Sequence, residues 1–271
     1  MRNLGWAVPI SAKTSPSLHT LRALPPFPPV AAKLMNLLRQ ENVDFRHAVE
    51  LMKLDPSITT EVLRLANSAS SGSRFPTTSL LQALSVLGVS RIVSLATTLC
   101  VGQLVKRLAK LPVMNRCWRH NLATALIASK GSQSCGVDSA KAYTFGLLAG
   151  IGRLALLSSN PEMYSHLVTR AANERMPLEM LEEELFGFDH REAGAWLVRE
   201  WRLPDELNNV LFSRSPADGP DCRFARLIRE AGSEADRLGF GVLDVIPSQP
   251  PDPSFFEIAG RVNQIEQDLA M

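Results

Sequence analysis

The stretch GFDHREAGAWLVREWRLP, residues 187–204, encodes the end of one helix and the start of the next. Gly187 suits the end of a preceding helix, because glycine adopts the left-handed conformation without strain. Asp189 and Glu192 have the spacing of a capping box, in which the aspartate accepts from first-turn amides and the glutamate reaches back. The helix that follows places three apolar residues on its inward face, namely Ala193, Trp196 and Leu197.

Helical spacing runs through almost the whole chain, and the strict alternation of a half-buried strand occurs nowhere. We therefore expect an all-α fold. The caps and apolar faces predict five N-terminal helices: residues 29–39, one after Asp44, one after Asp55-Pro56, residues 80–87 and residues 90–110. Pro112 marks a boundary, and an amphipathic helix over residues 255–269 follows the proline-rich IPSQPPDP.

Composition narrows the class of protein. The chain has 271 residues, 45% of them hydrophobic, which is enough to build a substantial core. Its 29 basic and 27 acidic residues give a net charge of +2, with no basic stripe interleaved with aromatics, so nucleic acid is not an expected partner. The apolar stretch 85–105 contains Arg91, which favours two soluble helices joined at Gly88 over a membrane span.

The cysteines and the N-terminus indicate a compartment. Four scattered cysteines without a C-x-x-C pair predict buried thiols, neither a zinc site nor a disulfide framework. The N-terminal residues contain no apolar stretch long enough for a signal peptide. We therefore expect a cytoplasmic protein.

A glycine-rich apolar run, GLLAGIGRL at residues 146–154, lies in a segment that Asp138 would cap and that we expect to be one helix. Gly146, Gly150 and Gly152 could let a ligand approach the backbone, but close packing of another helix is the favoured interpretation. No strand precedes the run and no Lys-Ser/Thr follows it, so it is not a phosphate-binding loop.

Three groups of motifs together resemble the HDOD family, signalling output domains related to HD-type metal phosphohydrolases. They are LPPFPPVAAKLMNLL with DPSITTEVLRLANSA, then CWRHNLATA with GLLAGIGRL, and finally residues 187–204. The resemblance implies an N-terminal helical bundle packed on a degenerate HD-like bundle. The expected boundaries are an arm over 1–17, an HDOD domain over 18–240 divided at 110/111, and a C-terminal tail over 241–271.

The same resemblance implies that most ligands of an HD-type metal site are missing. His120 matches the first histidine, but the His-Asp doublet falls on Ala149 and Gly150, which offer no donor. A later pair of histidines falls on Ser213 and Arg214. The late aspartate falls on Gly232, with Asp236 one turn further along.

Only His120 and His190 remain of this ligand set, so we expect no catalytic residues, no metal and no cofactor. Each remaining histidine has an ordinary interpretation. His120 is expected to be half-buried and bonded to a neighbouring helix, and His190 to be a first-turn residue beside the capping Asp189. His19, His47 and His166 are expected on the surface.

Two further groups of residues are candidates for partner contacts. One of Trp196 and Trp201 is expected in the core and the other is a candidate interface anchor. The charged run LEEELFGFDHRE is expected to be a solvated face, in which the glutamates 182–184 beside Arg191 could contribute to a protein-binding surface.

Three functions follow as hypotheses. The first is a non-catalytic bacterial signal-transduction protein that acts through contacts with unidentified signalling proteins. The resemblance sets it in two-component or cyclic-di-GMP-linked control of motility or stress responses. The second is a residual metal-dependent phosphohydrolase that uses His120, Asp189 and His190. The third is a module that senses a nucleotide or cyclic dinucleotide with Arg119 or Arg153 in the former catalytic cleft.

Overall fold

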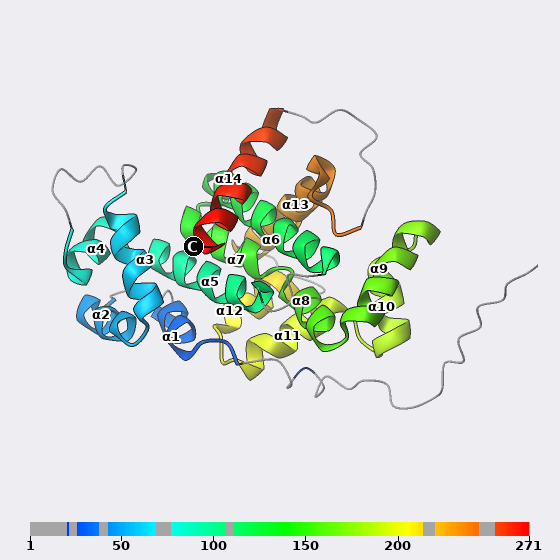
Figure 1. Ribbon diagram of the computed structural model, residues 1–271, viewed down its shortest axis with the longest axis horizontal. Coiled ribbons are helices and arrows are strands. Elements are labelled where there is room, and N and C mark those ends of the chain that lie inside the picture. Colours follow the sequence, from blue (N-terminus) through cyan, green and yellow to red (C-terminus); the bar gives the residue numbers. More distant parts are fainter. Residues whose placement is uncertain are drawn as a thin grey trace, which may run out of the picture.

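The computed structural model describes Leu21 and residues 26–37, 43–68, 77–106, 111–213, 220–243 and 253–270. The arm over residues 1–17 and His19 lie outside these ranges. Within them the secondary structure is helical and contains no strand, which confirms the all-α fold. Helices pack in two groups that share a continuous hydrophobic core (Figure 1).

The N-terminal bundle consists of five helices, α1 (Pro29–Leu37), α2 (Phe45–Lys53), α3 (Pro56–Ala66), α4 (Leu80–Leu87) and α5 (Val89–Lys106). Asp44 and Asp55 accept hydrogen bonds from first-turn amides and cap α2 and α3 as the sequence predicts. Gly88 ends α4 at φ +75°, so residues 85–105 are indeed two helices. Helix α5 also packs on α7 of the second group, which joins the two groups.

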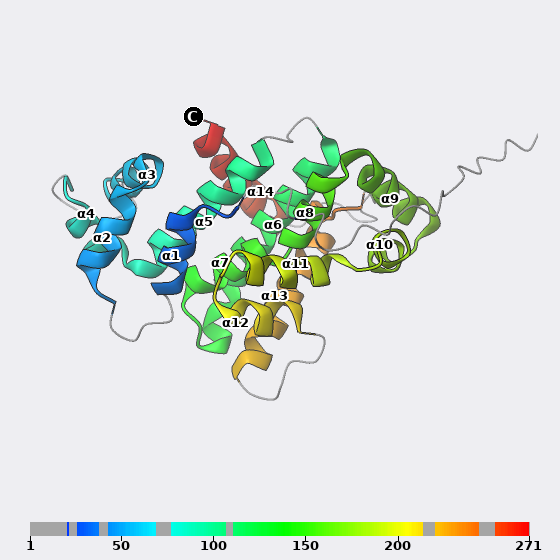
Figure 2. The same cartoon turned by 90° about the horizontal axis from the view of Figure 1, so that it is seen from below.

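The second group is built around α6 (Pro112–Gly131), which contacts α7 (Ser139–Leu148), α8 (Ile151–Ser159) and α13 (Pro220–Ala235). Helix α11 (His190–Glu200) packs along α8 (Figure 2). The remaining elements are η3 (Ser132–Cys135), α9 (Pro161–Glu174), α10 (Leu178–Phe186), α12 (Asp205–Leu207), η4 (Asn208–Phe212) and η5 (Asp236–Phe240).

The glycine-rich segment differs from its prediction. It forms two helices, because α7 ends at Leu148 and α8 begins at Ile151. Gly150, at φ −98° and ψ 15°, leaves the helical conformation between them. Glycine is a weak helix former, and the side chain of Asn121 lies against Gly150 at this point.

Two apolar segments, Val89–Lys106 and Ser139–Ser159, are long enough to cross a membrane by length and hydropathy alone. Buried residues make up 56% and 72% of these windows, so both segments act as core helices of the fold. The four cysteines are free. Cys100 and Cys117 are buried, and burial raises the pKa of each thiol to about 12, whereas Cys135 and Cys222 are half-buried.

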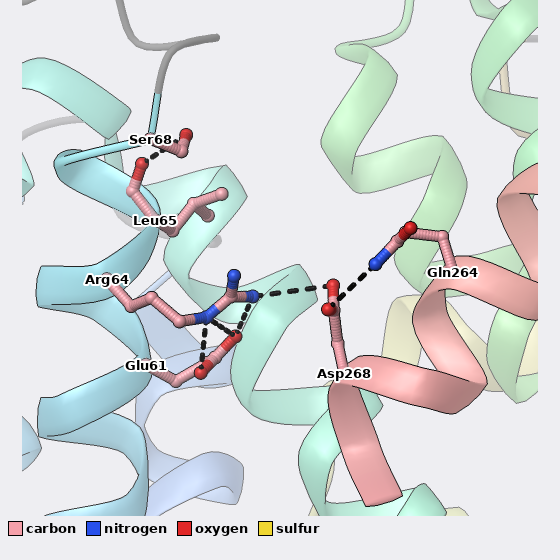
Figure 3. A network of polar contacts seen from close by, with 6 residues as sticks. All are labelled: Glu61, Arg64, Leu65, Ser68, Gln264 and Asp268. Carbon is pink, nitrogen blue, oxygen red and sulfur yellow. Dashed lines mark hydrogen bonds and ion pairs between the residues drawn. The ribbon is translucent and has the colours of Figure 1, made fainter. Parts of the chain in front are cut away.

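The C-terminal helix α14 (Pro253–Ala270) docks on the protein's own α6 and reaches the N-terminal bundle with its last turn. There Arg64 of α3 donates to Glu61 of the same helix and to Asp268 of α14, at 3.4 Å for the second contact. Gln264 donates to the same Asp268 at 3.0 Å. Helix α14 thus spans the joint between the two groups (Figure 3).

Candidate functional site

The position of the missing aspartate is filled by another side chain. A Cβ atom built on Gly150 would lie 2.1 Å from Oδ1 of Asn121, which is only 2% exposed, although its Nδ2 has no hydrogen-bond partner. Asn121 comes from α6, directly after His120. The structure has therefore no room for an aspartate side chain at Gly150 unless Asn121 moves.

The glycines on either side serve close helix packing, as the favoured interpretation holds. A Cβ on Gly146 would lie 2.7 Å from the Cα of Ala125 in α6. A Cβ on Gly152 would lie 1.8 Å from the carbonyl oxygen of His190 in α11. Helices α7 and α8 therefore approach their neighbours backbone to backbone.

A buried polar cluster lies where α8, α9, α10 and α11 meet. The carboxylate of Glu182 lies 2.6 Å from Nδ1 of His190 and accepts the backbone N–H of His190 at 2.9 Å. Tyr164 donates its hydroxyl to the other carboxylate oxygen. Arg153 lies close enough for its charge to lower the pKa of His190. All hydrogen-bonding capacity of this carboxylate is thus directed at the fold's own groups.

The charged run 182–184 was expected to be a solvated face, and this is wrong for Glu182, which has 0% of its surface exposed. Leu178 and Phe186 each lie four residues from Glu182 on the same helix face, and both are buried. That spacing was the available signal for its burial. Glu184 is exposed as predicted and pairs with Arg170 at 3.4 Å.

His190 is a first-turn residue of α11, as predicted, and Asp189 caps the helix by accepting from Glu192 at 2.8 Å. The histidine is fully enclosed, however, and its role is to hold Glu182. Burial and then the charge of Arg153 lower the pKa of His190. Burial alone would raise the pKa of Glu182, but the hydrogen bonds from His190 and from the hydroxyl of Tyr164 bring it below its ordinary value. We conclude that a neutral imidazole donates to a carboxylate.

This cluster makes stability depend on pH. In the unfolded chain this histidine has its ordinary pKa of 6.5, whereas in the folded protein its pKa is lower. Its contribution is complete above pH 6.5 and is lost as the pH falls toward its lowered pKa. The carboxylate of Glu182, whose pKa is also lowered, adds a second loss as the pH falls below its ordinary value of 4.5.

We expect the urea concentration at the midpoint of unfolding to decrease as the pH is lowered from 7.5 to 5.5. The His190→Asn substitution should make this decrease smaller. Substituting the exposed His166 in the same way is the matched control and should leave the slope unchanged. An identical pH profile for the wild-type and His190→Asn proteins would contradict the assignment of a neutral, buried His190.

His120 is buried on α6, outside this cluster. Its Nδ1 lies 3.3 Å from Oδ1 of Asp236 in η5. The two groups are not aligned for a hydrogen bond, and Nδ1 has no such partner. Asp236 rather than Gly232 is therefore the residue next to His120. A Cβ on Gly232 would meet nothing within 4 Å.

A cavity of about 650 Å³ opens between the buried cluster and His120. Arg116, Arg119 and Arg153 line it together with Glu179 and Asp236, and residues 176–178 and 239–243 form its walls. Glu179 connects it to the buried cluster, lying 3.9 Å from Nε2 of His190 and 4.0 Å from Arg153. We call this cavity the basic pocket. His120 and His190 do not line the pocket themselves, but each lies next to a carboxylate that does, Asp236 and Glu179 respectively.

The residues present do not fit an HD-type metal centre. Across the described ranges, no three His, Cys, Asp or Glu side chains gather around a point where they could share an ion. Ser213 ends its helix at an exposed position, and Arg214 lies outside the described residues. The Nδ2 atom of Asn121 has no hydrogen-bond partner, but it is a hydrogen-bond donor and is not a ligand for a cation.

The two candidate anchor tryptophans are both half-buried against the core. Trp201 stacks on Phe27, which precedes α1, with ring centroids 5.3 Å apart. Part of each ring remains accessible, so the role of one of them as an interface anchor stays a prediction. His47 and His166 are exposed, as expected.

Comparisons with known proteins agree with this architecture. A crystal structure of an HDOD domain protein of unknown function from Geobacter sulfurreducens matches with a TM-score of 0.68 and 21% identity, covering 93% of this chain and 88% of that one. A candidate signal transduction protein from Marinobacter aquaeolei gives 0.67 and 22%, covering 95% and 61%. At these identities the likeness shows a shared fold.

An uncharacterized protein of Treponema pallidum is 24% identical over 202 residues, which are 73% of this chain but only 39% of that protein. The chain therefore spans well under half of the curated relative's length. The family model for the HDOD domain matches residues 24–215, which include α1 to α12 and the buried cluster. Because this match covers well over half of the sequence, the chain belongs to the HDOD domain family.

Proposed function

We propose that this protein is a non-catalytic signal-transduction protein of the bacterial cytoplasm that acts by contacts with other signalling proteins. One observation carries the loss of catalysis. The side chain of Asn121 fills the position in which an HD-type site needs the aspartate of its doublet. A hydrolytic metal requires several anionic or imidazole donors and an open position for water, and here the central donors are replaced by packing.

The test is a search for hydrolysis. With Mn²⁺ or Mg²⁺ present, we expect the purified protein to hydrolyse p-nitrophenyl phosphate and bis(p-nitrophenyl) phosphate no faster than its His120→Ala variant does. Turnover that scales with protein concentration and falls in the His120→Ala variant would instead support the alternative, a residual metal-dependent phosphohydrolase.

Contacts with a partner are best supported on the N-terminal bundle. Leu54, at the end of α2, and Leu81 and Val86 of α4 are exposed, and α2 and α4 pack on each other. Exposed apolar side chains on neighbouring helices are typical of protein-binding surfaces. The structurally similar Marinobacter protein is named as a candidate signal transduction protein, which supports a signalling role. Control of motility or stress responses, in two-component or cyclic-di-GMP pathways, is the proposed setting.

We expect Leu54→Glu combined with Leu81→Glu to abolish capture of a partner while leaving the helical circular dichroism unchanged. The matched control is Met163→Glu, which changes an exposed apolar residue on the distant α9. Affinity capture with quantitative mass spectrometry compares the three baits. A partner bound equally by all of them would place the interaction surface elsewhere.

A second candidate function is favoured by the basic pocket. Three arginine side chains around one cavity suit phosphate groups, since guanidinium groups form strong, paired hydrogen bonds to phosphate oxygens. A cavity of about 650 Å³ is also within the range of small-molecule sites. A module that senses a nucleotide or cyclic dinucleotide is compatible with a signalling role and with the absence of catalysis.

A further inference from the structure

Arg119 belongs to two structures at once. It lines the basic pocket, and its guanidinium also holds α14, donating through Nη1 to Glu266 and through Nη2 to Asn263 at 3.0 Å. Helix α14 lies outside residues 24–215, the part that the family model matches. This chain has therefore tied a pocket-lining arginine of α6 to a helix beyond the matched domain.

Docking of α14 adds a negative charge beside the pocket. Three arginines line the cavity, and Glu179 and Asp236 are the carboxylates among its lining residues. Glu266, reaching Arg119 from α14, brings a third negative charge to the group. If α14 leaves, Arg119 loses its carboxylate partner, and its guanidinium then attracts an anion.

Apolar side chains supply most of the docking of α14. Ile258 and Val262 are buried, and Phe255, Ala259, Ile265 and Leu269 are half-buried against the core. Its ion pairs are largely exposed, including Lys130 with Glu257 at 3.0 Å and Arg64 with Asp268. Exposed pairs contribute about 0–1 kcal/mol each. Loss of the Arg119 pair therefore weakens the docking and raises the fraction of molecules in which α14 is detached.

The pocket wall and α14 are also mechanically continuous. Residues 239–243 form the wall, and Phe240 packs against Phe255 in the first turn of α14 with ring centroids 5.4 Å apart. Gly239 has φ +92°, a backbone conformation that suits glycine. Arg116 donates to the carbonyl of Val242 in the same wall at 3.0 Å. A ligand in the pocket would therefore touch the wall that carries Phe240, the residue in contact with α14.

We propose that the basic pocket binds a phosphate-bearing small molecule that competes with Glu266 for Arg119, so that binding of the ligand releases α14. The released helix and the surfaces of α3, α5 and α6 beneath it then become available to a partner. This inference rests on the proposed signalling role only in giving that release a use, because ligand binding and helix release are properties of the isolated chain.

Two variants that break the same ion pair should change affinity in opposite directions. Glu266→Gln removes the competitor, so calorimetry with GDP or pyrophosphate should show binding about fivefold tighter. Arg119→Gln removes the phosphate contact and should weaken binding about tenfold. Gln267→Ala, an exposed neighbour on α14, is the neutral control. Guanosine, which has no phosphate, should bind to none of the proteins.

Amide hydrogen exchange of residues 253–270 measures the detachment of α14 that ligand binding is expected to cause. Exchange should become faster in Glu266→Gln, in Arg119→Gln and in wild-type protein saturated with GDP. Asp268→Asn breaks the contact with Arg64, far from the pocket, and should both speed exchange and tighten binding, because coupling is reciprocal.

The proposal is overturned if neither GDP nor pyrophosphate binds, if both pair-breaking variants change affinity in the same direction, or if α14 exchanges no faster at saturation. Phosphate release is monitored in the same samples. Release from GDP would contradict the non-catalytic function while leaving the pocket intact, whereas absence of both binding and release would remove the pocket and leave that function standing.

Discussion

Gly152→Ala is expected to destabilise the protein by about 3 kcal/mol, at the upper end of the cost of overpacking. The added methyl group would lie 1.8 Å from the carbonyl oxygen of His190 and 2.8 Å from the amide nitrogen of Gly194. Both obstacles are backbone atoms of α11, so relief requires α8 and α11 to separate along their length. The contact between these helices is among the most extensive in the fold.

The matched control is Gly232→Ala on α13. It makes the same chemical change in a helix, but a Cβ there would meet nothing within 4 Å. Alanine should stabilise that helix by up to ~1 kcal/mol, since it loses less backbone entropy than glycine. Urea unfolding followed by circular dichroism measures both variants. Equal effects of the two substitutions would mean that α8 and α11 are not packed backbone to backbone.

These two glycines show how far the sequence alone could go. Helix positions and caps were predictable, because Asp44, Asp55 and Asp189 stand at recognisable spacings before apolar faces. The small size of Gly152 pointed to close packing. Its partner could not be named, since the carbonyl of His190 is 38 positions away in sequence and is brought close only by the tertiary fold.

The candidate site divides in the same way. The absence of donors at Ala149 and Gly150 was readable directly, but not what replaces them. Asn121 is adjacent to His120 and looks like an ordinary polar residue of a helix. Its contact with Gly150 depends on the break between α7 and α8, which the sequence suggested as one helix. The burial of Glu182 was also not predicted, because it lies in a charged run and its buried partners come from other helices.

Glu182→Ala is expected to cost about 3–5 kcal/mol, the range for removing one member of a buried ionic group. It leaves the Tyr164 hydroxyl and both the ring and backbone N–H groups of His190 without their acceptor, and it leaves Glu179 as the remaining carboxylate beside Arg153. Glu184→Ala, two residues along the same helix, removes only the exposed pair with Arg170 and should cost ~1 kcal/mol or less.

The pairing of Glu182 with His190 has a sharper test in a double-mutant cycle. If the imidazole is present mainly to satisfy this carboxylate, His190→Ala should cost much less in a Glu182→Ala background than in the wild-type protein. The expected interaction energy is about 1–3 kcal/mol, measured from urea midpoints at pH 7.5. Strict additivity would show that the two side chains stabilise the fold independently. The cluster then could not be one buried unit in which His190 serves Glu182.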